Sequence, residues 1–577
     1  METSKSYLKG AAVLGTAAVL SKLLGTVQKI PLQNLAGEEA FGIYNIVYPL
    51  YTLILTLAIA GFPLTVSAFV SEKMAMGSYR EARRILFVAS VILAFTGILF
   101  FIALYAGADQ LSLFLGAPQT APAIRSVSWA LLLVPVMAAL RGYFQGCGNM
   151  VPTALSQVAE QLVRVAVMLV LLFYYLELNL GADRIAAGAT FGSTAGALSG
   201  LMVMLFFWRR EQRRVNKVSR DDTPTYEIGS EEHCTARKVN SEPSESERVL
   251  PLLRRFFRVA LPICFGSIAL PALTLVDSVT LPRLLTSRGV AEAAGLYQIG
   301  LFNHAQPLVQ LVALIATSMS AALVPAVAFA RLQGETAILR RRTEDSVRAG
   351  WLVGFAASFG LAAASIPINI MLFKTSAGSG TMSILAFTAA FATLQIVTGS
   401  VLIGYNASRL PAIHLFAATI GKVLLNLLLV PAMGISGAAW ASVAAYAAAA
   451  LLNLAALSRL SGVRFTLGAY VWRPLAAASA MCCAVFASRG AVTALAHAFH
   501  GSSDSRGMAT LSALLAVTLG AAVYMAALLR LGCITRADLE AAPSAVTRLI
   551  PLLEQARLLA RIQKLSPCSA GKKEISP

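Results

Sequence analysis

The segment REARRILFVASVILAFTGILFFIALYAG, residues 80–107, places three arginines directly before an apolar run that contains no charged residue. The run, residues 85–107, matches the roughly 20 residues that a helix needs to cross about 30 Å of hydrocarbon. Basic residues beside such a run are typical of the cytoplasmic flank of a membrane-spanning helix. This segment therefore predicts one membrane crossing with its arginines on the inner side.

The same pattern recurs along the whole chain. Basic residues gather at the N-terminus and in every second gap between apolar stretches, so the number of crossings is even and both chain ends are predicted to be cytoplasmic. The fold class is an all-α integral membrane protein. We expect fourteen transmembrane helices, at 10–30, 43–71, 85–107, 126–145, 152–178, 184–208, 257–282, 296–329, 347–373, 381–404, 410–431, 434–458, 472–490 and 508–531.

Composition agrees with a multi-pass membrane protein. Hydrophobic residues make up 57% of the 577 residues, charged residues only 13%, and the mean hydropathy is +0.70. A soluble protein carries about a quarter charged residues. The net charge of +19 comes largely from basic residues beside the spans, where anionic lipid headgroups attract them. We therefore expect membrane lipids, and no nucleic acid, as partners of this charge.

One gap differs from all the others. Residues 209–255 mix Arg, Glu, Asp, Ser and Pro with almost no apolar residues, so they are predicted to form a disordered cytoplasmic linker. The linker separates six spans from eight. The predicted organisation is an N-lobe, this linker, a C-lobe, two additional spans, and a cytoplasmic amphipathic helix with a tail, at 1–208, 209–255, 256–460, 461–534 and 535–577.

Short sequences repeat in the same order on both sides of the linker. They include GIYNI at 42–46 with GLYQI at 295–299, and Gly142-Tyr143 with Gly404-Tyr405. Because each half contains six spans, the halves share one orientation and are related about an axis along the membrane normal. Two pseudo-symmetric six-helix lobes that rock around a central cavity are therefore predicted, with two appended C-terminal helices.

Three basic residues are predicted to lie deep in the membrane. Lys22, Arg164 and Lys422 each lie about 17 Å along a helix that runs from inside to outside. A charge at that depth costs on the order of 2.5–3.5 kcal/mol, so it faces a cavity or a partner. A central cationic cavity that receives an anion is the functional interpretation. The alternatives are an ion pair of Arg164 with Glu160, one helical turn away, and snorkelling or a carbonyl partner for Lys422.

Four further residues complete the set of candidate substrate-binding positions. Lys29 lies at the outer end of the first span, where substrate binding and an interfacial anchor are both open. Asp277 lies in the outer half of the seventh span, where a counter-ion role is favoured over a proton-coupling carboxylate or a link to Arg283. Asn303 and His304 lie in the eighth span, where polar residues either join helices or line a cavity.

RGYFQGCGNMVPTALSQVAEQLVRV at 141–165 closely resembles the fourth-to-fifth-span signature of the stage V sporulation protein B-like polysaccharide exporters. These belong to the multidrug/oligosaccharidyl-lipid/polysaccharide exporter superfamily. The resemblance covers the first twelve spans, and the linker and tail match nothing. The same group is similar to SKLLGTVQKIPL at 21–32, ALPICFGSIALPALTLVDSVTLPRLL at 260–285 and GLYQIGLFNHAQPLVQ at 295–310.

The resemblance implies a flippase of the bacterial cell membrane. Members of the family move undecaprenyl-pyrophosphate-linked sugars, including the peptidoglycan precursor lipid II, from the inner to the outer leaflet. Cationic residues of the first span and neighbouring helices line their cavity, which carries over to Lys22 and Lys29. Arg164 and Asp277 match positions usual in the group. The eighth span departs from the family, because an Asn-His pair stands where an acid–base pair is expected, so charge coupling there is expected to differ.

These observations together predict a transporter without catalytic residues. The pyrophosphate meets Lys22 and Arg164 in an inward-facing cavity, the prenyl tail stays in lipid between the halves, and rocking exposes the headgroup outside. No GxxxxGK[ST] loop occurs, and no resident cofactor or metal is expected. A monovalent cation or the membrane potential is the expected driving force, and the chain is expected to be a monomer. A cation-coupled multidrug exporter and a non-transporting scaffold for cell-wall or spore-coat assembly are the alternatives.

Overall fold

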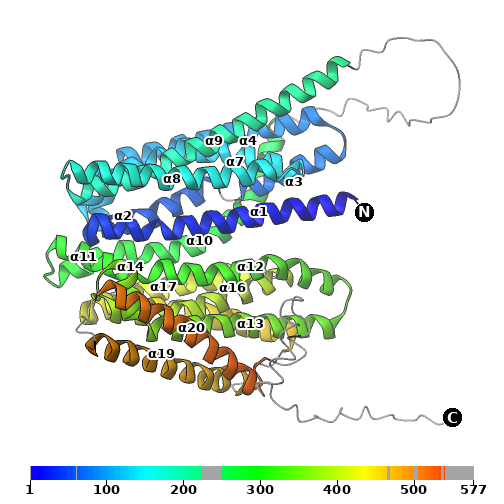
Figure 1. Ribbon diagram of the computed structural model, residues 1–577. Coiled ribbons are helices and arrows are strands. Elements are labelled where there is room, and N and C mark those ends of the chain that lie inside the picture. The colour runs from blue at the N-terminus through cyan, green and yellow to red at the C-terminus, as the bar shows by residue number, and fades with distance from the viewer. Residues whose placement is uncertain are drawn as a thin grey trace, which may run out of the picture.

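Over the residues that it describes, the computed structural model consists of helices joined by short turns, without a strand (Figure 1). These residues are 2–59, 61–221, 249–463, 465, 468–498, 505–534 and 539. The first half comprises α1 (Glu2–Val27), α2 (Lys29–Ile59), α3 (Phe62–Ala75), α4 (Tyr79–Ala106), α5 (Ala108–Leu115), the short 3₁₀ turn η1 (Pro118–Thr120), α6 (Ala121–Ser128), α7 (Ala130–Gly146), α8 (Val151–Glu177) and α9 (Ala182–Asp221). The second half comprises α10 (Val249–Ser287), α11 (Glu292–Phe302), α12 (Ala305–Leu332), α13 (Thr336–Ala363), α14 (Ser365–Phe373), α15 (Ser379–Ala386), α16 (Thr388–Gly404), α17 (Arg409–Met433), α18 (Ile435–Ser461), the π-helical turn η2 (Gly468–Trp472), α19 (Arg473–Ala498) and α20 (Arg506–Arg530).

Thirteen helical stretches among the described residues are long and apolar enough to cross a membrane. The first, Val13–Ala75, has 63 residues, about 95 Å at 1.5 Å per residue, which is enough for two crossings. The helical backbone breaks within it at Gly37, whose φ of 80° favours glycine, and α1 and most of α2 run in opposite directions (Figure 1). The all-helical membrane fold is confirmed, whereas the number fourteen and the cytoplasmic location of both ends stay predictions.

The two halves repeat one packing pattern. In the first half α8 packs against α9, and α7 packs against α3, α4 and α9. In the second half α17 packs against α18, and α16 packs against α12, α13 and α18. Likewise α1 contacts α8 as α10 contacts α17, which confirms two pseudo-symmetric lobes. The additional helices α19 and α20 pair with each other and pack against α13 and α14, while α10 and α11 join the halves along α2.

Prolines explain where several predicted spans divide into two helices. A proline lacks an N–H group and clashes with the carbonyl four residues earlier. Pro63, Pro307 and Pro367 accordingly lie four or five residues beyond the ends of α2, α11 and α13. The break before Pro307 places Asn303 and His304 at the junction of α11 and α12.

The described parts of the predicted linker, 209–255, are helical rather than disordered. Helix α9 continues through Asp221 and α10 begins at Val249, so both ends of 209–255 are helical, and 222–248 lie outside the described residues. Extending an existing helix needs no new nucleus, and the Arg-, Glu- and Gln-rich residues after position 208 are good helix formers. The predicted amphipathic helix and tail, 535–577, lie outside the described residues except for residue 539.

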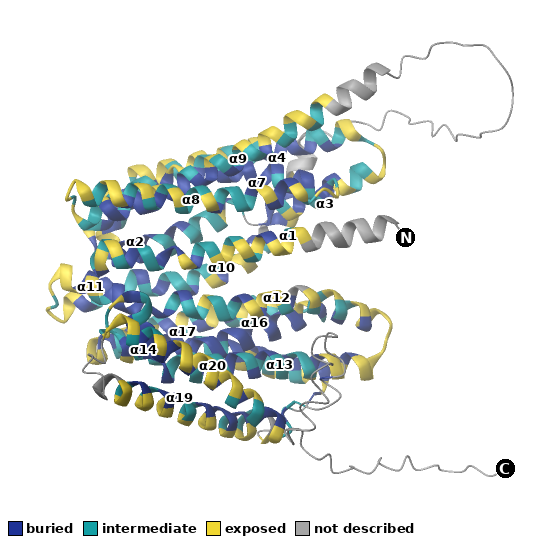
Figure 2. Cartoon of the chain, in the orientation of Figure 1, coloured by how far each residue is buried: buried dark blue, intermediate teal, exposed yellow. Residues whose placement is uncertain are grey.

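Burial follows the expectation for a bundle surrounded by lipid. Figure 2 shows exposed residues along the outer sides of the helices and buried residues between them. The outward side of α4 is apolar, with Phe87 69%, Phe95 68% and Ile102 56% exposed. Large exposed apolar surfaces of this kind mark contact with a membrane. We call the end of the bundle where α1 begins and α9 ends the proximal end, and the opposite end the distal end (Figure 1). The predicted orientation makes the proximal end cytoplasmic.

Candidate functional site

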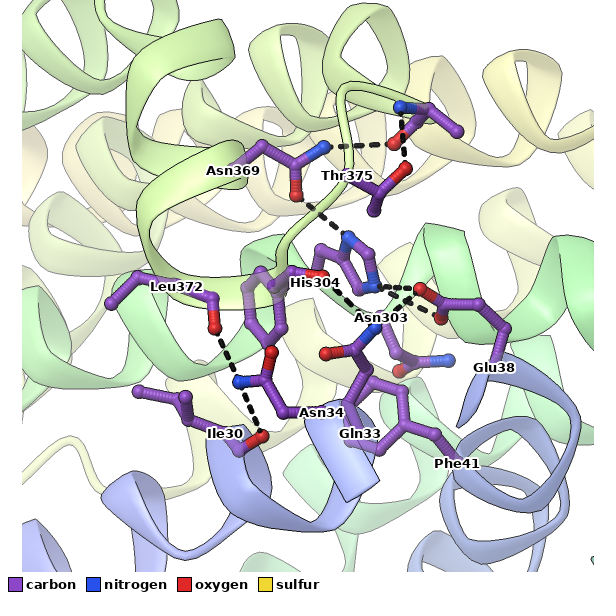
Figure 3. A network of polar contacts seen from close by, with 12 residues as sticks. Ile30, Gln33, Asn34, Glu38, Phe41, Asn303, His304, Asn369, Leu372 and Thr375 are labelled. Atoms are coloured by element: carbon purple, nitrogen blue, oxygen red, sulfur yellow. Dashed lines mark hydrogen bonds and ion pairs between the residues drawn. The ribbon is translucent and has the colours of Figure 1, made fainter. Parts of the chain in front are cut away.

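A buried polar cluster joins the two halves in the distal part of the bundle (Figure 3). We name it the distal clasp and define it as Gln33 and Glu38 of α2, His304 at the α11–α12 junction, and Asn369 of α14. The fully buried His304 places Nε2 2.9 Å from Oε1 of Glu38 and Nδ1 2.8 Å from Oδ1 of Asn369. Gln33 donates from Nε2 to Oε1 of Glu38 at 2.7 Å. One histidine ring therefore connects the N-lobe to two elements of the C-lobe.

Close packing surrounds the clasp. The Phe373 ring stacks on His304, with the ring centroids 4.1 Å apart. A β-carbon at Gly300 of α11 would collide with the backbone carbonyl of Glu38. Only glycine permits this approach of α11 to α2, so the halves are held together there by both sterics and hydrogen bonds. Asn303, beside His304, uses its Nδ2 on the carbonyl of Ile299 at 2.8 Å, within its own helical segment.

The N-lobe holds a basic cluster in which one acid serves two arginines. Nη2 of Arg141 lies 2.9 Å from Oε2 of Glu160, and Nη2 of Arg164 lies 2.9 Å from Oε1. Since two guanidinium groups share one carboxylate, the cluster keeps one positive charge. Nε of Arg164 and the hydroxyl of Tyr51 are buried and have no hydrogen-bond partner among the described residues. The predicted Glu160–Arg164 pair is thus confirmed, but it does not neutralise the cluster.

Lys29 extends this positive region towards the C-lobe. It is only 3% exposed, and its Nζ donates to Oε1 of Gln306 on α12 at 3.3 Å. The same Nζ lies 5.9 Å from the ring centroid of Tyr48, which stacks on Tyr44. All of these partners of Lys29 are formally neutral, so its charge is uncompensated by a carboxylate there.

Lys22 lies on α1 and is exposed. Its ammonium forms no hydrogen bond or ion pair with the part of the chain that the structure describes. Helix α1 packs against α8 of its own lobe and against α12 of the other. Together with Lys29 and the arginine cluster, Lys22 gives the N-lobe an excess of positive charge inside the membrane-spanning region.

The C-lobe, in contrast, neutralises its lysine. Nζ of Lys422 on α17 lies 2.6 Å from Oδ2 of Asp277 on α10 and donates to the carbonyl of Leu273 at 3.2 Å. Asn426 bonds the other oxygen of Asp277 at 3.2 Å. This confirms the interpretation of Asp277 as a counter-ion rather than a link to Arg283. The pair lines a small pocket of about 100 Å³, which Gln306 also lines.

The structure therefore links the predicted site residues in a different way from a single cationic chamber. Lys29 reaches the Lys422–Asp277 pocket through Gln306, and His304 joins the lobes at the clasp. Arg164 stays within the N-lobe, paired with Glu160. The depth-matched residues Arg164 and Lys422 occupy equivalent helices, α8 and α17, yet only the N-lobe member belongs to a cluster with surplus charge.

A large apolar groove lies on the C-lobe, beside the additional helices. It has a volume of about 940 Å³ and is lined by residues of α12, α13, α14, α19 and α20. Its lining extends from Asp345 of α13 to Ala364, the residue after that helix, about 29 Å at 1.5 Å per residue, which is close to the thickness of the hydrocarbon core. Its proximal end is polar and is formed by Asp345 and Arg348, with Nη2 of Arg348 3.3 Å from Oδ1 of Asp345.

Sequence reasoning missed Glu38, Asn369 and Arg141 as partners of the predicted residues. Glu38 follows the Gly37 break, and that glycine was its only local signal. Asn369 lies 65 residues from His304, so nothing local connects them. Arg141 opens the fourth-to-fifth-span signature, and its relation to Glu160 follows only from the packing of α7 against α8 and α9.

Comparison with known proteins places the chain in a family. Residues 7–333 match the family described as polysaccharide biosynthesis protein. The uncharacterized membrane protein YabM of Bacillus subtilis (strain 168) is 33% identical, with 93% of this chain and 94% of the relative covered. The lipid II flippase MurJ of the same organism is 26% identical, with 92% and 96% covered. The stage V sporulation protein B of that organism is 26% identical, with 81% of this chain and 86% of the relative covered, which confirms the predicted resemblance.

Solved structures agree with this assignment at the level of the fold. A structure described as lipid II flippase MurJ in an inward closed conformation has a TM-score of 0.62 at 13% identity, with 89% of this chain and 98% of that chain covered. An inward-facing multidrug resistance MATE family transporter of the MOP superfamily has a TM-score of 0.60 at 15% identity, with 77% and 95% covered. The chain therefore belongs to the polysaccharide biosynthesis protein family and is a multi-pass membrane transporter.

Proposed function

We propose that this protein moves an undecaprenyl-pyrophosphate-linked sugar, such as a lipid II-like cell-wall precursor, from the inner to the outer leaflet by alternating access. The observation that carries the proposal is the surplus positive charge of the N-lobe, made by Lys22, Lys29 and the Arg141–Glu160–Arg164 cluster. Uncompensated charge in a membrane-spanning region is costly, and it is retained where it has a function. A diphosphate supplies the complementary negative charge.

The geometry suggests roles for particular groups. Lys22, exposed and without an ion-pair partner among the described residues, is the first contact for the diphosphate. Lys29 and the free Nε of Arg164 bind it further in, since a charge-assisted hydrogen bond is about twice as strong as a neutral one. The Lys422–Asp277 pair is internally neutral, so we assign it to the architecture of the C-lobe rather than to the anion.

The apolar groove supports the same proposal from the lipid side. Its lining crosses the thickness of the hydrocarbon core, so a prenyl chain lying there stays in apolar surroundings while its headgroup changes sides. We infer that the tail occupies this groove instead of the gap between the lobes. The membrane potential is the driving force that best fits net negative cargo on cationic side chains, because moving one charge across 100 mV is worth about 2.3 kcal/mol.

Native mass spectrometry of the protein purified in mild detergent tests the substrate class. We expect a co-purifying species with the mass of a prenyl diphosphate-linked sugar, and we expect Lys22→Gln to lower its occupancy severalfold. Arg125→Gln serves as the matched control, because Arg125 pairs with Asp109 on an exposed surface. Recovery of bulk phospholipids alone, in equal amounts with all three proteins, would contradict the proposal.

Filling the groove is expected to slow transport without unfolding the protein. Ala521 and the adjacent Ala522 of α20 are both exposed, but only Ala521 lines the groove. Ala521→Trp should lower the flipping rate of a fluorescent lipid II analogue in liposomes by roughly tenfold, because the indole removes apolar tail contacts that contribute about 1.4 kcal/mol, and that energy corresponds to a factor of ten in rate. Ala522→Trp should leave the rate within about twofold. Equal rates in the two variants would exclude a role for the groove.

A further inference from the structure

The hydrogen bonds of the distal clasp determine how many protons it holds. Nδ2 of Asn369 donates to the carbonyl of Ala377 at 2.8 Å and to Oγ of Ser379 at 3.0 Å. A carbonyl can only accept, so the amide nitrogen is the atom that faces Ala377 and the oxygen Oδ1 faces His304. That oxygen, 2.8 Å from Nδ1, also can only accept. Nδ1 of His304 therefore carries a proton.

A second proton lies on the side of the His304 ring that faces Glu38. Nε2 of Gln33 donates both to the carbonyl of Phe373 at 3.2 Å and to Oε1 of Glu38, so Glu38 accepts from Gln33. Nε2 of His304 lies 2.9 Å from Oε1 and 3.0 Å from Oε2 of Glu38. A hydrogen bond at this distance needs a proton on either the ring nitrogen or the carboxyl oxygen. Either way, the Glu38–His304 pair shares one proton and is neutral overall.

We propose that Glu38 and His304 form a proton-binding site that locks the distal ends of the two lobes together, so that distal opening releases a proton. The proposal rests on the alternating access proposed above. Parted and hydrated, a glutamate and a histidine share no proton at pH 8, since their ordinary pKa values are about 4.3 and 6.5. Closing the clasp then takes up a proton, and opening it gives one back.

The linkage has a definite sign. The closed form binds more protons than the open form above about pH 6.5, so acid favours the closed form and alkali favours opening. Each pH unit in that range changes the closed-to-open ratio by up to about tenfold, and below it the dependence disappears because the parted histidine is itself protonated. Among the described residues, Glu38 of α2 is the charged group that hydrogen-bonds the His304 ring, and the ring's contacts from α14 are the neutral Asn369 and Phe373. Lys29 hydrogen-bonds Gln306, two residues along the chain from His304. Glu38 is therefore the group with which His304 shares the proton.

Distance measurements between spin labels at the distal end test this proposal. Leu178 after α8 and Met433 at the end of α17 are 51% and 49% exposed, so cysteines there can be labelled once the native cysteines are replaced. The protein is reconstituted in nanodiscs without substrate and measured by pulsed electron paramagnetic resonance from pH 6 to pH 9. We expect the long-distance population to grow with pH, by up to about tenfold per unit relative to the short one. A population that does not change with pH, or grows as pH falls, overturns the proposal.

Two variants separate the proton from the packing. Glu38→Gln keeps a donor for Nε2 without a titratable carboxyl, so we expect a closed clasp and a flat pH profile. His304→Ala removes both hydrogen bonds and is expected to be open at every pH. His414→Gln is the matched control, because His414 also bonds an asparagine, Asn453, at 2.7 Å, but within the C-lobe. It should keep the wild-type profile.

A wild-type pH slope in Glu38→Gln, or a closed distal end in His304→Ala, contradicts the proposal. Because no lipid-linked substrate is present, a negative result here leaves the flipping assays and mass spectrometry to decide the proposed substrate separately. Conversely, a pH-dependent clasp with no bound prenyl diphosphate would keep the proton site and reject that substrate.

Discussion

Lys29→Gln is expected to lower the flipping rate of a lipid II analogue in liposomes by roughly 10- to 100-fold while leaving thermal stability unchanged or slightly higher. The loss follows because a hydrogen bond to a charged group contributes about 1.5–3 kcal/mol, and every 1.4 kcal/mol is tenfold in rate. Stability should not fall, since Lys29 is 3% exposed and bonds a neutral glutamine in the absence of substrate. Removing an uncompensated buried charge relieves a cost.

This combination of effects distinguishes a binding residue from a structural one. A lysine that held the lobes together would lose stability and activity in parallel. Lys29→Arg should keep part of the activity, because it keeps the charge but not the compact ammonium. Arg125→Gln, which removes an exposed cation, should leave both the rate and the melting temperature near wild type. A Lys29→Gln protein that flips lipid at the wild-type rate would remove Lys29 from the proposed site.

Span positions could be predicted from the sequence because bilayer thickness sets a length that apolar runs must meet. The relation between the two lobes could be predicted from the sequence repeat. Gly142 and Gly404, which are paired in that repeat, take equivalent places in the structure. A β-carbon on Gly142 would lie 2.6 Å from the carbonyl of Pro63 in α3, and one on Gly404 would lie 2.7 Å from a side-chain atom of Val327 in α12. Both glycines allow close approach of equivalent helix pairs, which preserves the repeat.

The pairing of charges could be predicted only where it is local. Glu160 and Arg164 are one turn apart, so helix geometry alone suggested their ion pair. Lys422 and Asp277 are separated by 145 residues, and depth in the membrane could place each of them but not join them. Depth also grouped Arg164 with Lys422, although they belong to different lobes, and the Arg141–Glu160–Arg164 cluster keeps one positive charge whereas the Lys422–Asp277 pair is neutral. Pairing across helices depends on helix rotation, which the apolar pattern of a lipid-surrounded bundle specifies poorly.

The clasp was the least predictable part of the site. His304 was recognised as a polar residue in a span, with joining helices and lining a cavity both open, and the structure gives it hydrogen bonds that join helices. Its partner Glu38 lies beside a break at Gly37 that ends one helical direction and begins another. Breaks of this kind arise from a single φ angle, so hydropathy does not reveal which side chain follows the turn into the protein.

Replacing Lys422 alone is expected to destabilise the protein strongly, whereas replacing it together with Asp277 is not. Lys422→Ala leaves Asp277, whose side chain is 15% exposed, without its cation, and breaking a buried ion pair from one side costs about 3–5 kcal/mol. Lys422→Met with Asp277→Leu removes both charges and keeps the volume, which is often close to neutral. Thermal unfolding in detergent should therefore show a large drop in melting temperature for each single variant and recovery in the double variant.

The double variant also decides what the pair does. The pair holds α10 against α17. Asn426 also donates to the hydroxyl of Thr280 at 2.8 Å, a hydrogen bond that does not involve Asp277, so the C-lobe of the double variant is expected to keep its packing. If Lys422 is architectural, the double variant flips lipid at a rate within about threefold of wild type, roughly 0.7 kcal/mol. If the double variant is stable but inactive, Lys422 and Asp277 act on the cargo or on a coupling cation. The assignment of anion binding to the N-lobe alone is then wrong. A single Lys422→Ala variant as stable as wild type would contradict the ion pair itself.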